Sequence, residues 1–263
     1  MSFGSNNLND LFADALNGGV IGAQAASMLS GNLGSIVVAG AAGKSMEDIV
    51  STDVTLITVL LDASSSIASS GLEQAVRDGY NTLVDTFMQS KERDSIMLAL
   101  WTFNDEQSVM HSYMPILEAT KLDASNYQAG GATALYDTWC AALAANIAYA
   151  QQLRNTGTPC RSIVVILTDG EDCGSDRTPS ECASLSRDLL KSEQFILAFV
   201  GVGSDSSFRD VARSMGVPDG CIEVQASANP AALRKIFHMV SQSAIRASQA
   251  LIKPGSQAGF FQP

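Results

Sequence analysis

Short apolar runs alternate with longer amphipathic stretches along the chain from residue 54 onward. Uncharged runs of this length, bounded by turn residues, predict buried strands. The predicted strands are Val54 to Leu61, Ser95 to Phe103, Val109 to Ile116, Ile163 to Leu167, Phe195 to Val202 and Cys221 to Val224.

The stretches between these runs have helical periodicity. Leu72, Val76, Leu83 and Phe87 recur at three-to-four spacing, which forms one apolar stripe on a helix. The other predicted helices are Ala134 to Leu153, which is mostly apolar and therefore buried, Pro179 to Lys191, Ser206 to Met215 and Pro230 to Ile245. The prolines that open two of these helices fit a first turn, where proline loses no hydrogen bond.

The alternation of strands and helices predicts an α/β fold with three layers. Strands that carry almost no charge and are separated by helices indicate a central, mostly parallel sheet covered on both faces, as in Rossmann-like folds. The run from Val109 follows the preceding strand after a short polar turn, Asn104 to Gln107. So tight a connection predicts an antiparallel strand, placed at the sheet edge.

Residues 1–50 have a different composition, because the stretch from Ala15 to Gly43 is rich in Gly, Ala and Ser and carries no charge. A flexible, nonglobular arm is the first interpretation. Packing against another subunit or protein is the second, since closely spaced glycines permit tight contact. Membrane insertion is disfavoured by the polar residues in this stretch. We therefore predict an arm at 1–50, a domain at 51–247 and a loose tail at 248–263.

A net charge of -11 argues against nonspecific binding to nucleic acid or anionic lipid, which require basic patches. The chain has 5 cysteines and no Cys-x-x-Cys pair. The odd number and the absence of a signal-peptide pattern favour a reducing, cytoplasmic location. As an alternative, Cys173 and Cys182 flank a short loop and could form a disulfide.

Three polar stretches follow predicted strands or lie in the loops between elements, where open α/β sheets collect their ligands. Asp62, Ser64 and Ser66 end the first strand, Thr133 lies before the apolar helix, and Asp169 follows the fourth strand. Carboxylate and hydroxyl oxygens are hard ligands that suit Mg²⁺, with Mn²⁺ or Ca²⁺ as alternatives. These residues predict one divalent-metal site.

At these residues the chain resembles the von Willebrand factor A family and its metal-ion-dependent adhesion site, which has the pattern Asp-x-Ser-x-Ser, a Thr and an Asp in successive loops. The resemblance spans roughly residues 52–245. It implies that Asp62, Ser64 and Ser66 hold the ion, that Thr133 coordinates it when a ligand is bound, and that Asp169 binds directly or through water. It also implies recognition of a Glu or Asp carboxylate of a protein partner, without catalysis.

Three further acids lie near the predicted ligands in sequence. Glu171 and Asp172 follow Asp169, and they either support the site through water or face solvent. Asp137 lies four residues after Thr133, where it either supports the site or only stabilises the start of the next helix.

Two other kinds of site are disfavoured. Gly40 to Ser45 resembles part of a phosphate-binding loop, but Val38 occupies the position that requires the first glycine. A metal-dependent hydrolase would need a base and an enclosed pocket, and neither His111 nor His238 lies near the predicted ligands in sequence.

The sequence around Thr133, together with the missing signal peptide, resembles the intracellular bacterial members of the family, which implies an adaptor or scaffold role. A self-assembling structural protein is the alternative: the Gly-rich arm would reach into a neighbouring copy and build a homo-oligomer or filament.

Overall fold

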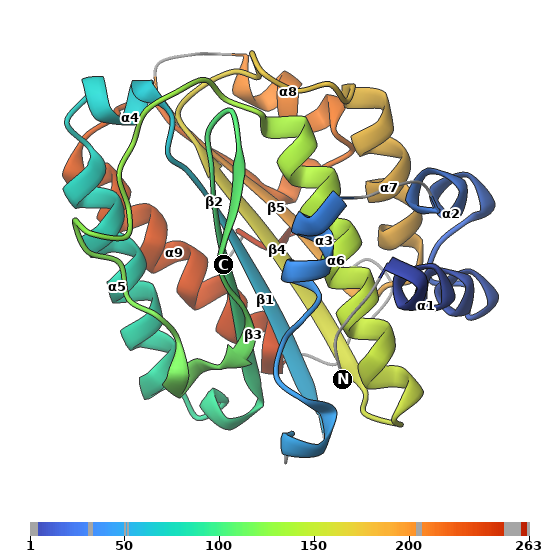
Figure 1. Cartoon of the computed structure of the whole chain (residues 1–263). Coiled ribbons are helices and arrows are strands. Elements are labelled where there is room, and N and C mark those ends of the chain that lie inside the picture. Colours follow the sequence, from blue (N-terminus) through green and yellow to red (C-terminus); the bar gives the residue numbers. More distant parts are fainter. Residues whose placement is uncertain are drawn as a thin grey trace.

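The computed structural model describes residues 5–30, 34–49, 51, 53–203, 207–249 and 259–261. Within this part the chain forms a six-stranded sheet in the order β3-β2-β1-β4-β5-β6 (Figure 1). The strands are β1 Val54–Asp62, β2 Ile96–Phe103, β3 Gln107–Pro115, β4 Cys160–Thr168, β5 Phe195–Val202 and β6 Ile222–Gln225. Only the β2–β3 pairing is antiparallel, so the predicted parallel sheet with an antiparallel edge strand is confirmed.

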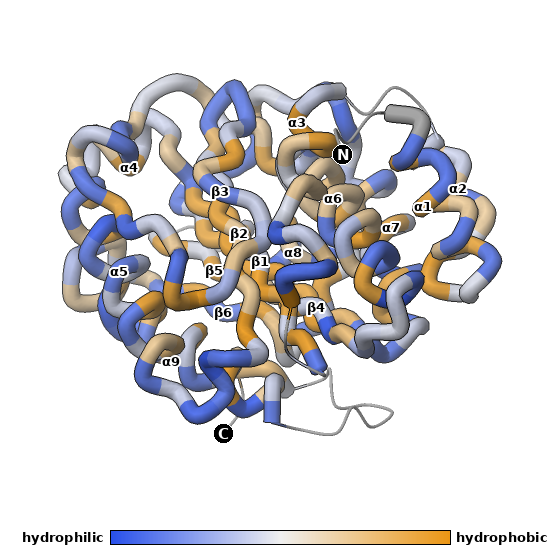
Figure 2. Tube along the Cα trace, turned by 60° about the horizontal axis from the view of Figure 1, so that its bottom comes forward, coloured by the Kyte–Doolittle hydropathy of each residue, from blue (hydrophilic) through white to orange (hydrophobic). Residues whose placement is uncertain are grey.

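Helices cover both faces of the sheet. The main helices are α5 Glu73–Gln89, α6 Leu135–Asn155, α7 Pro179–Lys191, α8 Phe208–Ser214 and α9 Pro230–Gln249, and a short α4 spans Ser65–Ser69. In Figure 1, α5 and α9 pack together on one face, whereas α6 and α7 lie on the other. Figure 2 shows the hydrophobic positions of the central strands gathered between these helical layers. The predicted three-layer α/β fold is therefore the observed one.

The N-terminal segment is folded against the rest of the molecule. It forms α1 Ser5–Asn17, α2 Ala23–Leu29 and α3 Gly34–Gly40. Helices α1 and α3 pack against α6, and α2 contacts α7. Because α6 is covered by these helices on one side and by the sheet on the other, its mostly apolar sequence is buried nearly all round.

The expectation of a nonglobular arm is therefore wrong for the described residues of this segment. Its apolar residues are too few and too widely spaced by Gly and Ala to suggest a core, yet Leu8, Phe12 and Ala15 share the buried face of α1. Small residues bring the backbone close to the domain: a Cβ atom on Gly40 would lie 2.1 Å from Cζ2 of Trp101. Among the described helices, none is both long and apolar enough to cross a membrane.

The alternative of a disulfide between Cys173 and Cys182 is not observed. All five cysteines are free thiols, and Cys173 is exposed while Cys182 is buried. The sulfur of Cys182 instead lies 3.6 Å from the sulfur of Cys140, where α7 packs against α6.

We expect Phe12→Ala to lower the free energy of unfolding by about 3–5 kcal/mol, because it removes a large side chain buried between α1 and the domain. Leu16→Ala is the matched control on the same helix, since Leu16 is 36% exposed. That control should change the stability by less than about 1 kcal/mol. Urea unfolding measures both. Equal, small effects of the two substitutions would show that α1 does not pack as described.

Candidate metal centre

The site begins with two neighbouring parallel strands that end at the same edge of the sheet. Strands β1 and β4 pair up to Leu61 and Leu167, and each then continues into a polar residue. Asp62 is the last residue of β1, and Asp169 directly follows the last residue of β4. The strand register therefore brings the two carboxylates, 107 positions apart in sequence, to one edge.

The hydroxyls of the first loop connect these carboxylates. The backbone N–H of Ser64 donates to Oδ1 of Asp62 at 2.7 Å, which folds the loop back over the strand end. The Oγ atoms of Ser64 and Ser66 lie 2.9 Å apart, and Ser66 donates to Oδ1 of Asp169 at 2.6 Å. Four oxygen-bearing side chains thus form one continuous group.

The loop before α6 places Thr133 at the same edge. The backbone carbonyl of Gly131, two residues before Thr133, accepts a hydrogen bond from the backbone N–H of Ser65 at 3.0 Å. This bond joins the loop before α6 to the loop after β1. Gly131 has φ of 84°, a conformation that a side chain would strain. A Cβ atom placed on Gly170 would lie 3.4 Å from Oγ1 of Thr133 and 3.6 Å from Oγ of Ser66, so both hydroxyls lie around the start of the third loop.

The carboxyl of Asp62 is strongly perturbed by its surroundings. Burial raises the pKa of Asp62 from 3.8 to about 6, and the nearby charge of Asp169 adds to this increase. Hydrogen bonds from Ser64 and Thr168 act in the opposite direction. Burial also raises the pKa of Asp169, with a hydrogen bond from Ser66 opposing it. Among the described ion pairs, none involves either carboxylate.

Two residues that the sequence analysis did not select hold Asp62 in place. The hydroxyl of Thr168 donates to Oδ2 of Asp62 at 2.5 Å, and the hydroxyl of Tyr127 donates to the backbone carbonyl of Asp62 at 2.5 Å. Both side chains are buried. Thr168 precedes Asp169, so the signal in the sequence was a polar residue at the end of the apolar run Ile163 to Leu167. The role of Tyr127 depends on a distant loop and has no local signal.

The three additional acids lie around the site, and each has a partner of its own. Oδ1 of Asp172 accepts hydrogen bonds from the backbone N–H groups of Leu135 at 2.9 Å and Tyr136 at 3.3 Å, and so caps α6 directly after Thr133. Asp137 accepts a hydrogen bond from the backbone N–H of Arg177 at 2.9 Å and so fixes the loop between β4 and α7. Glu171 accepts a hydrogen bond from the hydroxyl of Ser207.

The group of oxygens fits a hard divalent cation. Asp62 and Asp169 supply carboxylates, while Ser64, Ser66 and Thr133 supply neutral hydroxyls, the donor types that Mg²⁺, Mn²⁺ and Ca²⁺ prefer. In the part of the chain that the structure describes, no cluster of three or more His, Cys, Asp or Glu side chains forms a different metal site. Asp62 is buried and Asp169 half-buried, and among the described residues neither has a cationic side chain beside it. Such a pair of carboxylates is costly, and a bound cation would compensate it.

A shallow depression of about 270 Å³ adjoins the site. Its walls combine polar and apolar groups: Ser66, Ser70, Asp169, Gly170, Glu171, Val202, Gly203, Phe208 and Ala228. The two histidines lie elsewhere, His111 in β3 and His238 in α9, so neither lines this depression. The open shape suits contact with a macromolecule better than enclosure of a small substrate.

Comparison with known proteins gives the family and similar folds. The family model described as von Willebrand factor type A domain matches residues 57–238. A von Willebrand factor type A structure from Catenulispora acidiphila is 16% identical with a TM-score of 0.51, and the match covers 73% of this chain and 43% of that one. Proximal thread matrix protein 1 from the mussel byssus is 21% identical with a TM-score of 0.50, with coverage of 75% and 48%.

The pilus adhesin SpaC from Lactobacillus rhamnosus GG, in its open conformation, is 12% identical with a TM-score of 0.56, and the match covers 74% of this chain and 30% of that one. At these identities the likeness concerns the fold alone, and the matched region spans less than half of each of these proteins. The search of curated proteins found no match. Because the family model covers more than half of the chain, the protein belongs to the von Willebrand factor type A domain family.

Proposed function

We propose that the protein is a metal-dependent recognition module that binds a carboxylate of a protein partner. The observation that carries this proposal is the continuous group of Asp62, Ser64, Ser66 and Asp169 at the sheet edge, beside Thr133. In this proposal Asp62, Ser64 and Ser66 hold a divalent cation, with Mg²⁺ as the first choice. Asp169 binds it directly or through water, and Thr133 joins when the partner is bound.

The chemistry of the donors supports an exchangeable position for the partner. Ser64, Ser66 and Thr133 add coordinating oxygens without adding charge, so the cation keeps its attraction for an external Glu or Asp side chain. The chain has a net charge of -11, and a bound cation would provide a local positive centre on this acidic protein. An open depression beside the site leaves room for the residues that flank the partner's carboxylate.

Recognition without catalysis is the form of this proposal that the site favours. Hydrolysis would require a general base near the cation. Both histidines lie away from the site, and Glu171, which lines the depression, already accepts a hydrogen bond from Ser207. A cytoplasmic adaptor or scaffold role follows from the sequence resemblance and stays a prediction. The described N-terminal helices pack on their own domain, so we do not propose that an arm builds a filament.

The partner-binding proposal predicts that immobilised protein retains a partner in Mg²⁺ and releases it in EDTA. Asp62→Ala should abolish retention, because it removes the buried carboxylate of the site. The matched control is Asp85→Ala, which removes an exposed carboxylate on α5 and should leave retention unchanged. Converting the partner's carboxyls to neutral amides should also prevent capture. Retention that survives EDTA, or that is equal in the two variants, would contradict the proposal.

The raised pKa of Asp62, about 6, predicts that protons compete with the metal. Because the pKa of Asp62 is higher in the folded, metal-free protein than in the unfolded chain, protonation of Asp62 increases the free energy of unfolding as the pH falls through about 6. This contribution is lost as the pH rises above that value. Saturating Mg²⁺ should therefore raise the melting temperature more at about pH 7.5 than at about pH 5, where Asp62 is protonated.

Asp62→Asn is the control for this experiment, because it removes the titrating group with little change in size. It should abolish both the Mg²⁺-dependent shift and the contribution of this residue to the pH dependence. A Mg²⁺-dependent increase in melting temperature that is the same at both pH values would contradict the assignment of Asp62 as the group that holds the ion.

A further inference from the structure

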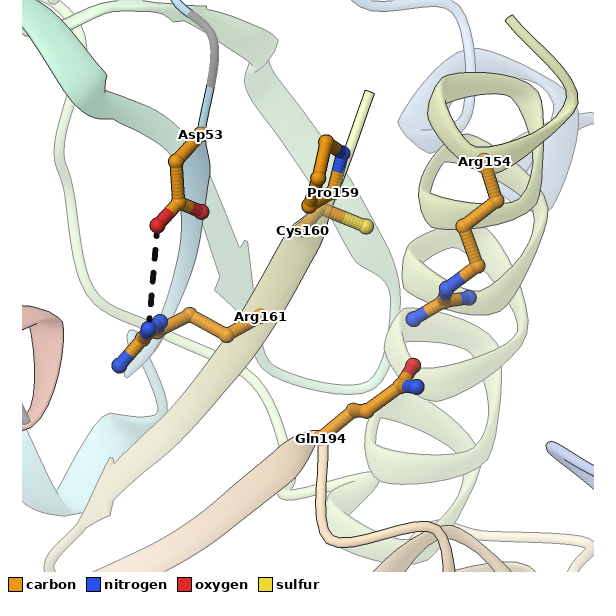
Figure 3. Close-up of a pocket in the computed structure, with 6 residues that line it drawn as sticks. All are labelled: Asp53, Arg154, Pro159, Cys160, Arg161 and Gln194. Atoms are coloured by element: carbon orange, nitrogen blue, oxygen red, sulfur yellow. Dashed lines mark ion pairs between the residues drawn. The ribbon is translucent and has the colours of Figure 1, made fainter. Parts of the chain in front are cut away.

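A second pocket lies at the opposite end of the sheet from the metal centre. It has a volume of about 320 Å³ and is lined by Asp53, Arg154, Pro159, Cys160, Arg161 and Gln194 (Figure 3). These residues come from the start of β1, the last turn of α6, the start of β4 and the residue before β5. The nine residues of β1 separate the two ends by about 27 Å of strand, so this pocket is distinct from the metal centre.

The guanidinium of Arg154 is the unusual group in this pocket. Both Nη1 and Nη2 are buried without a hydrogen-bond partner, and Arg154 belongs to none of the described ion pairs. Arg154 lies in the last turn of α6, where the helix dipole favours a cation. Its Nη atoms nevertheless donate to none of the backbone carbonyls of that helix. Buried donors are normally paired, so this arrangement points to a missing acceptor.

Gln194 also carries a polar group without a partner in this pocket. Its Oε1 is also buried without a hydrogen-bond partner, and its side chain and that of Arg154 point toward one another in Figure 3. The oxygen and the nitrogen of the Gln194 amide are similar in shape, so a half-turn of the amide places its NH₂ group where Oε1 lies, facing Arg154. A ligand oxygen between the two side chains would then accept hydrogen bonds from both.

The charge balance of the pocket selects the class of ligand. Arg161 already has partners: it lies 3.8 Å from Asp53 and donates to the carbonyl of Ala247 at 2.8 Å. The uncompensated charge is therefore the single positive charge of Arg154. A planar guanidinium matches a carboxylate, which carries one negative charge, better than a phosphate dianion.

The remaining wall is apolar and chemically inert. Pro159 and the buried side chain of Cys160 line the pocket beside Arg154. Burial raises the pKa of the Cys160 thiol, which points to a packing role and not to a nucleophile. A ligand with an apolar body would contact this wall while its carboxylate pairs with the guanidinium. We infer that this pocket binds a small monocarboxylate with an apolar body, held by Arg154 and Gln194.

The test uses benzoate and hexanoate as probes, with the full chain in EDTA so that no metal-bound carboxylate contributes. Calorimetry should show saturable binding of at least one of these carboxylates, and weaker binding of benzyl alcohol and of phosphate. Arg154→Met should reduce the affinity at least about tenfold. The matched control is Arg187→Met, which removes an exposed arginine of α7 and should leave the affinity unchanged. Asp62→Ala should also leave it unchanged.

Arg154→Lys provides a second test that keeps the charge at this position. It should bind the carboxylates less tightly than the wild type, because an ammonium lacks the planar pair of donors. If Arg154→Met does not fold, the carboxylate affinities of Arg154→Lys and Gln194→Leu, measured by the same calorimetry, test the inference. The inference is overturned if the wild type binds neither carboxylate saturably, if phosphate or benzyl alcohol binds as tightly, or if the folded Arg154 variants bind as the wild type does.

Discussion

The buried carboxylate of Asp62 and the half-buried carboxylate of Asp169 lie at one sheet edge without a described cationic side chain beside them, and this is the constraint on which the metal-centre account depends. Adjacent parallel strands deliver both groups to one edge, and desolvation raises both pKa values. Proteins compensate buried carboxylates with hydrogen bonds, with protons or with cations. Here Ser64, Ser66 and Thr168 provide the hydrogen bonds, and the remaining negative charge makes a divalent cation the natural complement.

The rest of the fold keeps this arrangement rigid. Thr133 lies two residues before the start of α6 at Leu135, and the first N–H groups of this helix are capped by Asp172 from the loop that also carries Asp169. Helix α6 is in turn held between the sheet and the N-terminal helices α1 and α3. A site on loops is therefore supported by a buried helix and a central sheet, which favours a preorganised recognition surface.

The sheet, its antiparallel edge strand and the candidate metal ligands could be predicted from the sequence, because each depends on residues that are close together in the chain. Uncharged runs such as Ile163 to Leu167 gave the strands, and the short turn after Phe103 gave the antiparallel edge. Four of the five candidate ligands stand out because polar residues end or follow apolar strands, and Thr133 stands out because it lies in the loop before an apolar helix. The structure brings all five to one edge. Their role as metal ligands stays a prediction. The N-terminal helices were missed because the apolar residues of α1 are few and lie among polar and small ones. Thr168, Tyr127 and the unpaired Arg154 acquire their significance only through contacts between distant segments.

The most direct test of the central claim is the anomalous scattering of a crystal grown with Mn²⁺, which can replace Mg²⁺ among hard oxygen ligands. The account predicts a single strong peak at direct coordination distance from the carboxylate of Asp62 and the hydroxyls of Ser64 and Ser66. Asp62→Ala crystals grown in the same way should lack that peak. A well-ordered crystal with no peak at these oxygens, or an unchanged peak in Asp62→Ala, would contradict the account.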